Sequence, residues 1–351
     1  MTTLKEVAKR AGVSVGTVSN VVTGTVPVSS ARRERVLAAI SELGYQPNHV
    51  ARSLKLRRTK MLGMVISDIT NPFFSQMVRG AEDAALRRNY LLLTFNTDDR
   101  AEREKEVISV LRSQRVDGIL LVVASEQRRP SHILETIRRG IPVVCLDRLP
   151  PGVSVDSVTV DNTGAARDCV QHLLKLGHRK IGIIAGSLSL QTASERLQGY
   201  KEALAEAGID PRPEWILQGN FRIESGYRLG RQLLTSLDRP TALFISNNLM
   251  ALGILKALAE LDLRCPEDVA LATFDELPLM EAFRPHLTAV AQPAYSFGYS
   301  GAELLIQRIE SKTHAKTPVA IRLPTELKIK ESTLGYRFST RQDCACLLGN
   351  S

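Results

Sequence analysis

Apolar side chains in the first 45 residues recur every three or four positions over three short stretches. This spacing predicts three helices whose inner faces share a small core. The inner positions are Leu4, Val7, Ala8 and Ala11 in the first helix, Val18, Val21 and Val22 in the second, and Val36, Leu37, Ile40 and Leu43 in a third spanning about 30–43. Thr3 and Glu6 form a capping-box pattern, Gly12 is typical of a helix end, and Ser14 can cap the second helix. Two helices joined by a tight glycine turn predict a helix-turn-helix.

From residue 60 onwards, short apolar runs alternate with amphipathic helical stretches. The runs are 62–66, 91–95, 118–123, 142–146, 180–184, 242–245 and 269–274. Such alternation predicts an α/β fold in which helices cover both faces of parallel sheets. The stretch KMLGMVI at 60–66 resembles KIGII at 180–184, and a polar loop and a helix follow each. We therefore expect two similar lobes, with a ligand in the cleft between them.

These patterns divide the chain into a head, a linker, a body and a tail. We expect the helix-turn-helix head at 1–46, a hinge segment at 47–59, a two-lobe body at 60–338 and a tail at 339–351. Within the body, the first lobe is expected to comprise 60–161 and 292–322, and the second 162–291 and 323–338. The crossings near 161, 291 and 322 are then expected to form the hinge of the cleft.

Charge is concentrated at the N-terminal end of the chain. Residues 1–60 hold 11 basic and three acidic residues, a net charge of +8, whereas the other 291 residues hold 35 basic and 34 acidic residues. A cationic head on a near-neutral body predicts that the head meets a polyanion. The second helix would then present Val15, Gly16, Thr17, Ser19 and Asn20, compact or polar side chains suited to the edges of bases in the major groove.

Several classes of protein are disfavoured by the sequence. Only Cys344 and Cys346 of the five cysteines lie close together, and the six histidines are scattered, so we expect no disulfide framework, metal or cofactor. The chain has no GxSxG elbow, no P-loop and no GxGxxG after a strand, which argues against an enzyme. It also lacks the apolar run of a signal peptide and any run near the ~20 residues of a membrane span, so we expect a cytoplasmic protein.

The stretch LKEVAKRAGVSVGTVSNVV, followed by GYQPNHVARSLK, resembles the N-terminal domain of the lactose/galactose repressor family of bacterial transcription regulators. The resemblance implies operator DNA as a partner and a homodimer, because two-fold operators mirror two-fold proteins. It implies that residues 48–55 form a hinge helix on DNA, with Leu54 wedged between base pairs of the minor groove. The DNA-binding residues expected are Thr3, Ser14, Val15, Gly16, Thr17, Ser19, Asn20, Thr23, Ser29, Asn48, Ala51, Arg52 and Leu54.

Polar and aromatic residues follow the apolar runs of the body. Aromatic faces suit the C–H face of a sugar, while Asp, Asn and Arg side chains bind its hydroxyls. The body resembles periplasmic sugar-binding proteins, ribose-binding protein in particular. The effector-binding residues expected are Asn71, Phe73, Phe74, Asp147, Arg148, Thr192, Arg196, Phe221, Asn247, Asn248, Asp275 and Gln292. We expect a sugar-responsive regulator, acting as a repressor, whose effector binding shifts the lobes and the hinge segments.

Two departures from the family pattern bear on the effector. Leu190 stands where purine-responsive members have an arginine, which argues against a purine. Asn248 replaces a usual aspartate and removes a negative charge, which makes a sugar acid or sugar phosphate an alternative to a neutral monosaccharide. A sugar-binding protein or enzyme without a regulatory role is a further alternative, which the head disfavours. The tail lacks leucine heptads, so no tetramerisation helix is expected.

Overall fold

The computed structural model describes residues 2–23, 26–45, 58–124, 130–276, 281–311 and 317–335. Contacts between Cα atoms divide the chain into two compact units, 1–60 and 61–351, called here the head unit and the body. The predicted hinge positions Asn48, Ala51, Arg52 and Leu54 lie outside the described residues, as does the Cys344–Cys346 pair. None of the described helices is long and apolar enough to cross a membrane.

The described part of the head unit contains the helices α1 (Leu4–Ala11), α2 (Val15–Thr23) and α3 (Ser30–Glu42). The capping box of Thr3 and Glu6 is formed, and Gly12 ends α1 with a left-handed backbone. Ser14 caps α2 by accepting a hydrogen bond from the backbone of Thr17 at 3.1 Å. The buried core consists of Val7, Ala8, Ala11, Val18, Val36, Ala39 and Tyr45.

One of the predicted core positions in α3 is wrong. Leu37 is 50% exposed, whereas Val36 and Ala39 are buried. Successive residues of a helix differ by about 100°, so the side chain after Val36 points away from the face that packs on α1 and α2. Ile40 and Leu43 are partly buried against the same core, as the spacing predicts.

The body contains two six-stranded sheets, each with its own helices. The strands of the first sheet are β1 (Met61–Ile66), β2 (Leu91–Asn96), β3 (Gly118–Leu121), β4 (Val143–Leu146), β5 (Asp156–Val160) and β11 (Ala320–Leu323). Those of the second are β6 (Ile181–Ala185), β7 (Ile216–Gln218), β8 (Ala242–Ile245), β9 (Ala270–Phe274), β10 (Thr288–Ala291) and β12 (Glu326–Lys328). All pairings are parallel except that of β10 with β12, which confirms the predicted α/β class.

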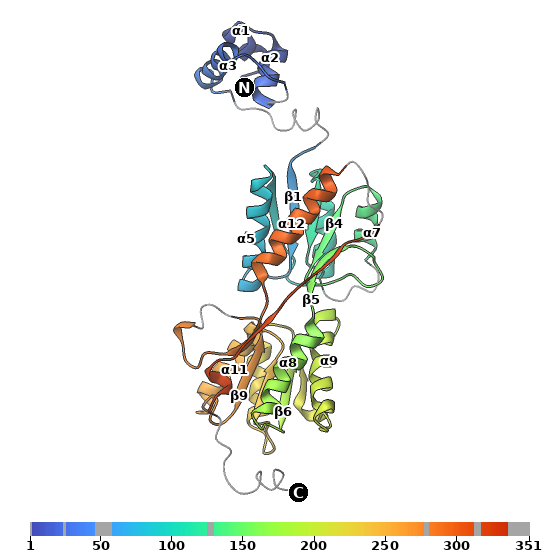
Figure 1. The fold of residues 1–351 in the computed structure, drawn as a ribbon, viewed down its shortest axis with the longest axis vertical. Helices are drawn as coiled ribbons and strands as arrows, with labels where there is room; N and C mark the ends of the chain where they lie inside the picture. The colour runs from blue at the N-terminus through green and yellow to red at the C-terminus, as the bar shows by residue number, and fades with distance from the viewer. Residues whose placement is uncertain are drawn as a thin grey trace. The chain divides into compact units, whose positions relative to one another are not determined.

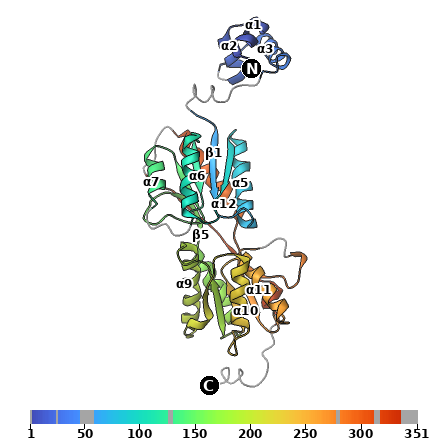
Figure 2. The same cartoon turned by 180° about the vertical axis from the view of Figure 1, so that it is seen from behind.

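Helices cover both faces of each sheet, as Figures 1 and 2 show. The first sheet carries α5 (Pro72–Arg87) and α12 (Ala294–Glu310) on one face and α6 (Ala101–Ser113) and α7 (Ser131–Arg138) on the other. The second sheet carries α8 (Asn162–Lys175) and α9 (Gln191–Glu206) on one face and α10 (Ile223–Leu234) and α11 (Asn248–Glu260) on the other. Among the described residues, short 3₁₀ turns lie at Pro213–Trp215 and Glu331–Thr333. Each lobe is therefore a doubly wound layer with two buried cores.

The two sheets have the same strand order. The first runs β11-β5-β4-β3-β1-β2 and the second β12-β10-β9-β8-β6-β7, so β1 and β6 occupy corresponding places. The sequence similarity between 60–66 and 180–184 thus marks equivalent strands. The chain passes between the sheets at residue 161, at 292–293 and at 324–325, called here the three interlobe connections.

Candidate functional site

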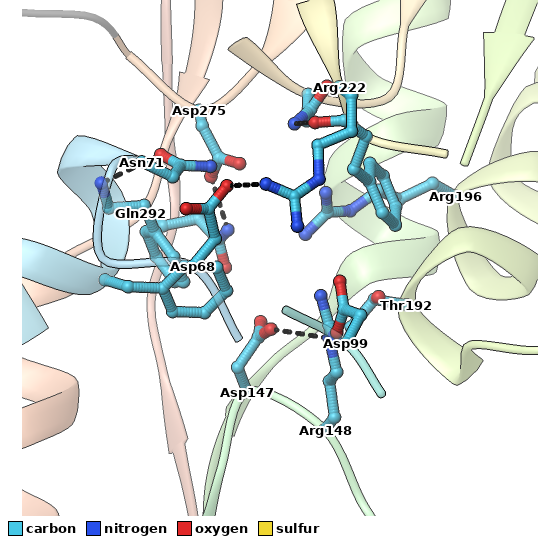
Figure 3. Close-up of a pocket in the computed structure, with 14 residues that line it drawn as sticks. Asp68, Asn71, Asp99, Asp147, Arg148, Thr192, Arg196, Arg222, Asp275 and Gln292 are labelled. Carbon is cyan, nitrogen blue, oxygen red and sulfur yellow. Dashed lines mark hydrogen bonds and ion pairs between the residues drawn. The ribbon is translucent and has the colours of Figure 1, made fainter. Parts of the chain in front are cut away.

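The carboxyl ends of strands from both sheets surround one pocket in the body, shown in Figure 3. The space left free between its side chains is small, about 30 Å³. The lining residues are Asp68, Asn71, Phe73, Phe74, Asp99, Asp147 and Arg148 from the first lobe, Thr192, Arg196, Phe221, Arg222, Asn247 and Asp275 from the second, and Gln292 from an interlobe connection. Ligands of doubly wound folds bind at such strand ends.

Four lining residues have a left-handed backbone conformation, and one of them is Asp99, with φ 60°. Asp147 follows β4 with φ 65°, Phe221 follows β7 with φ 64°, and Asp275 follows β9 with φ 68°. Side chains other than glycine adopt this region rarely, and such strain gathers at ligand sites. The strand ends therefore turn sharply enough to direct these side chains into the pocket.

Ion pairs hold two of the three arginines in the pocket. Arg148 Nη1 lies 2.5 Å from Asp99 Oδ1, and Arg148 Nε lies 3.4 Å from Asp147 Oδ2. Burial lowers the pKa of Arg148, but the charges of Asp99 and Asp147 outweigh it and leave the pKa raised. Arg222 of the second lobe forms an ion pair with Asp68 of the first lobe.

Arg196 is held by neutral groups. Its Nε donates to Asn162 Oδ1 at 2.9 Å and its Nη1 donates to the carbonyl oxygen of Ser246 at 2.7 Å. The guanidinium carbon lies 3.7 Å from the centroid of the Phe274 ring, a cation–π contact. Burial lowers the pKa of Arg196, although Asp275 and Asp147 oppose the shift. These contacts fix the guanidinium while its carboxylate neighbours stay beyond ion-pair distance.

Two buried carboxyl groups face this arginine. Burial raises the pKa of Asp147 to about 6, against the opposing charges of Arg148 and Arg196. Burial also raises the pKa of Asp275, which accepts a hydrogen bond from Gln292 Nε2 at 2.5 Å. Among the described residues, Asp147 Oδ1 and Gln292 Oε1 are buried without a hydrogen-bond partner. Such acceptors cost free energy unless a donor reaches them, so the pocket is suited to a ligand rich in hydroxyl groups.

The aromatic walls of the pocket are locked in place. Phe73 and Phe74 pack edge to face with ring centroids 5.2 Å apart, and Phe73 also contacts the first-lobe core. The backbone carbonyl of Phe221 accepts a hydrogen bond from Asn247 Nδ2 at 3.0 Å. A Cβ at Gly186 would lie 2.0 Å from the Phe221 ring, so only glycine leaves room for this ring.

The structure brings together eleven of the twelve predicted effector residues. Asn248 is the exception, because it does not line the pocket and its Nδ2 donates instead to Asn71 Oδ1 at 3.2 Å. Sequence reasoning missed Asp68, Asp99 and Arg222. Asp68 comes two residues after the end of β1 and Asp99 three residues after the end of β2, and Arg222 adjoins Phe221, so their places after strands were the available signal.

The predicted DNA-reading residues of the head unit lie on or beside α2. Val15 is 42% exposed, Gly16 is exposed, and Thr17, Ser19 and Asn20 are half-buried. Thr3 and Ser14 are exposed caps, and Ser29 is exposed at the start of α3. Thr23 ends α2. The first residues of α2 thus offer an accessible surface.

Among the described residues no group of His, Cys, Asp and Glu side chains could hold a metal ion. The three described cysteines are free; Cys145 and Cys169 are buried, and burial raises the pKa of both thiols. In the pocket, Arg148 and Arg222 form ion pairs with acidic side chains, whereas Arg196 and Asp275 form hydrogen bonds with neutral groups.

Comparison with known proteins gives matches along the chain. A model of the bacterial regulatory proteins of the lacI family matches residues 3–48, and one of the periplasmic binding protein-like domain matches 170–333. The HTH-type transcriptional repressor PurR of Vibrio vulnificus (strain CMCP6) is 37% identical over 316 residues, covering 90% of this chain and 94% of the relative.

Two solved structures extend the likeness. A complex of the transcriptional regulator CelR with cellobiose shares 35% identity, covers 95% of this chain and 100% of the other, and has a TM-score of 0.71. The lac repressor dimer bound to operator and the anti-inducer ONPF shares 28% identity, covers 95% of this chain and 99% of the other, and has a TM-score of 0.85.

Proposed function

Because this chain belongs to the lacI family of bacterial regulatory proteins, we propose that its pocket binds a neutral monosaccharide and that this binding controls repression by the head unit. Members of this family are DNA-binding transcriptional regulators and not enzymes, and the chain combines their helix-turn-helix with an effector-binding domain. The observation that carries the proposal is the set of buried, unpartnered acceptors beside a fixed arginine in one pocket.

The chemistry of the pocket favours a sugar. Asp147 and Gln292 offer acceptors, Arg196 offers guanidinium donors, and aromatic rings form the walls. Vicinal hydroxyls pair with such forks of donors and acceptors, while apolar C–H faces pack on aromatic rings. The CelR structure is a complex with cellobiose, which agrees with a sugar site in this fold.

The balance of charge favours a neutral sugar over a sugar acid or sugar phosphate. Asp68 is paired with Arg222 and Asp99 with Arg148, which leaves Asp147 and Asp275 facing Arg196. An anionic ligand would add charge to an environment that already raises the pKa of both carboxyl groups. Asn248, whose missing charge pointed to an acid, does not line the pocket.

For the head unit we propose operator binding as a homodimer in the cytoplasm. The residues proposed to read bases are Val15, Gly16, Thr17, Ser19 and Asn20, supported by phosphate contacts from the caps. The lac repressor in the solved complex is a dimer on its operator, which supports the same assembly for this chain. The head, hinge and lobe boundaries predicted from the sequence are part of this proposal.

A ligand screen followed by a DNA titration tests the proposal. The full chain is screened by thermal shift against D-ribose, other monosaccharides, cellobiose, gluconate, sugar phosphates and a purine base. We expect a neutral monosaccharide to raise the melting temperature most, and to change the affinity for operator DNA selected from random sequence. A response confined to gluconate or phosphates would move the assignment to acidic sugars, and operator affinity unchanged by every stabilising ligand would contradict effector control.

A further inference from the structure

A buried carboxylate lies outside the pocket lining and close to one of its arginines. Glu104 is in the first turn of α6 and is 0% exposed. A buried charge is costly unless hydrogen bonds compensate it. Glu104 Oε2 accepts from the backbone N–H of Ala124 at 2.6 Å, and Oε1 lies 2.6 Å from Nε2 of His132. Since a carboxylate only accepts, the imidazole presents its Nε2–H to Glu104.

These two partners connect Glu104 to the pocket. Ala124 directly follows Val123, whose carbonyl oxygen accepts from Arg148 Nη1 at 3.3 Å. Val123 and Ala124 are 3% and 2% exposed, so neither has room to move independently. The same Nη1 also contacts Asp99 and Ser67, which together with Val123 define where the Arg148 guanidinium lies.

We propose that Glu104 is a positioning residue for effector recognition, holding the Val123–Ala124 backbone against which the Arg148 guanidinium is oriented. This inference rests on the proposed function of the pocket and adds a residue that does not touch the effector. His132 takes part by fixing the other carboxylate oxygen, so that Oε2 is directed at Ala124. A buried bond to a charged acceptor is stronger than a neutral one and tolerates little displacement.

The charge of Glu104 has a second effect on the same guanidinium. Burial lowers the pKa of Arg148. The charges of Asp99 and Asp147 raise this pKa most, and the charge of Glu104 raises it by a smaller amount. Glu104 therefore supports the cationic form of Arg148 as well as its place. Both effects reach the effector only through Arg148.

A double-mutant cycle tests this dependence. Glu104→Met keeps the length of the side chain and removes both hydrogen bonds, whereas Glu104→Gln keeps an acceptor for Ala124 and removes the charge. Glu106→Met on the same helix is the matched control, because Glu106 is exposed. Each change is made in the full chain and in an Arg148→Lys background, and affinity for D-ribose, or for the tightest-binding sugar of the screen, is measured by calorimetry.

We expect Glu104→Met to weaken sugar binding about tenfold, equivalent to about 1.4 kcal/mol, and Glu104→Gln to restore most of the loss. In the Arg148→Lys background, Glu104→Met should add little further loss, because its effect passes through the guanidinium. Operator binding without sugar should persist in every variant and confirms folding. The role of Glu104 would be overturned, and the proposed function left standing, by either of two results. One is an equal loss of sugar affinity from Glu104→Met in the wild-type and Arg148→Lys chains, and the other is wild-type sugar affinity in the Glu104→Met variant. A wild-type chain that binds no sugar would overturn the proposed function instead.

Discussion

Arg222 and Asp68 form an ion pair that joins the second lobe to the first at the pocket. The Asp68 side chain is 9% exposed and that of Arg222 is 32% exposed, so the pair is only partly shielded from water. A second contact across the lobes is the hydrogen bond from Asn248 Nδ2 to Asn71 Oδ1, at 3.2 Å. Closure of the lobes is thus supported by the protein's own side chains as well as by any effector.

Arg222→Gln should favour a more open body in the absence of effector, because it removes the charge that Asp68 holds across the lobes. Small-angle X-ray scattering of the effector-free protein should give a larger radius of gyration than for the wild type. Arg228→Gln, a change at an exposed position in α10, which begins directly after Arg222, serves as the control. Scattering curves that superimpose for Arg222→Gln and wild type would contradict a role in closure.

Arg196→Ala and Asp275→Asn should each weaken binding of a neutral sugar by a similar factor. Each change leaves hydroxyl groups without a partner, at a cost of about 1–3 kcal/mol. Operator binding without effector should survive, since neither change touches the head unit. Calorimetry with the best ligand decides: a much larger loss for Arg196→Ala would indicate an acidic ligand, whose carboxylate pairs with the arginine alone.

The effector pocket was largely predictable because its residues follow strands, and strand ends meet at one edge of a parallel sheet. Asp147, Phe221 and Asp275 could be assigned from that position alone. Arg222 could not, because its role depends on an ion pair with Asp68, which is 154 residues away in the chain. Leu37 was misplaced because an apolar residue beside a core position is indistinguishable from it by composition.

The apolar patterns in the sequence also failed to predict several strands, mainly those at the edges of the sheets. The apolar runs identified seven strands. They missed the short, half-exposed edge strands β7, β11 and β12 as well as the short internal strand β10. Short edge strands carry little hydrophobic signal, and β12 joins its sheet antiparallel through a partner 37 residues earlier, Val290 with Leu327. The internal strand β5 was missed because the polar residues Asp156, Ser157 and Thr159 interrupt its apolar pattern.

Asp147 should make the protein less stable as pH rises from about 4 to about 6. Its folded pKa is raised from 3.8 to about 6 by burial, so the folded state binds more protons than the unfolded state between these values. Its contribution to stability is therefore present at low pH and lost above pH 6. Asp147→Asn should raise the free energy of unfolding at pH 7 by up to about 3 kcal/mol and remove this pH dependence.

Urea denaturation at pH 4.5 and pH 7 measures the effect on stability, and a variant that matches the wild type at both values would contradict it.

The carboxyl group of Asp147 also predicts how effector binding depends on pH. Hydroxyl donors favour the ionised form, so affinity for a neutral sugar should increase from pH 5 to pH 7. An acidic sugar should show the opposite trend, because its charge opposes that of Asp147.

Gly186→Ala should weaken effector binding by displacing the Phe221 ring. An added Cβ would lie 2.0 Å from the ring, far inside contact distance, and the left-handed backbone of Phe221 leaves it few alternative positions. We expect a loss on the order of tenfold in affinity, about 1.4 kcal/mol. In a Phe221→Ala background, Gly186→Ala should cause no further loss of affinity. Calorimetry on the wild type, the two single variants and the double variant measures this.

Changes at Val15 should alter which operator bases are preferred. Val15 is exposed and is the first residue of α2, and contacts with base edges in the groove determine sequence preference. Arg57→Gln removes a cation from the hinge segment predicted at 47–59, so it should weaken binding to all DNA sequences alike and lower the salt dependence of binding. Selection from random DNA checks both variants. If several Val15 variants select the same consensus sequence as the wild type, α2 does not contact the bases. A chain lacking residues 1–59 should bind no operator DNA.

The three interlobe connections are each only one or two residues long. Mechanically, two bodies joined by three short tethers can turn about the line of the tethers but can neither slide far apart nor twist freely. Gln292 sits on one tether and donates to Asp275, so a ligand that engages this pair touches the pivot itself. A small rotation about this pivot displaces the parts of each lobe that lie far from it by a larger distance.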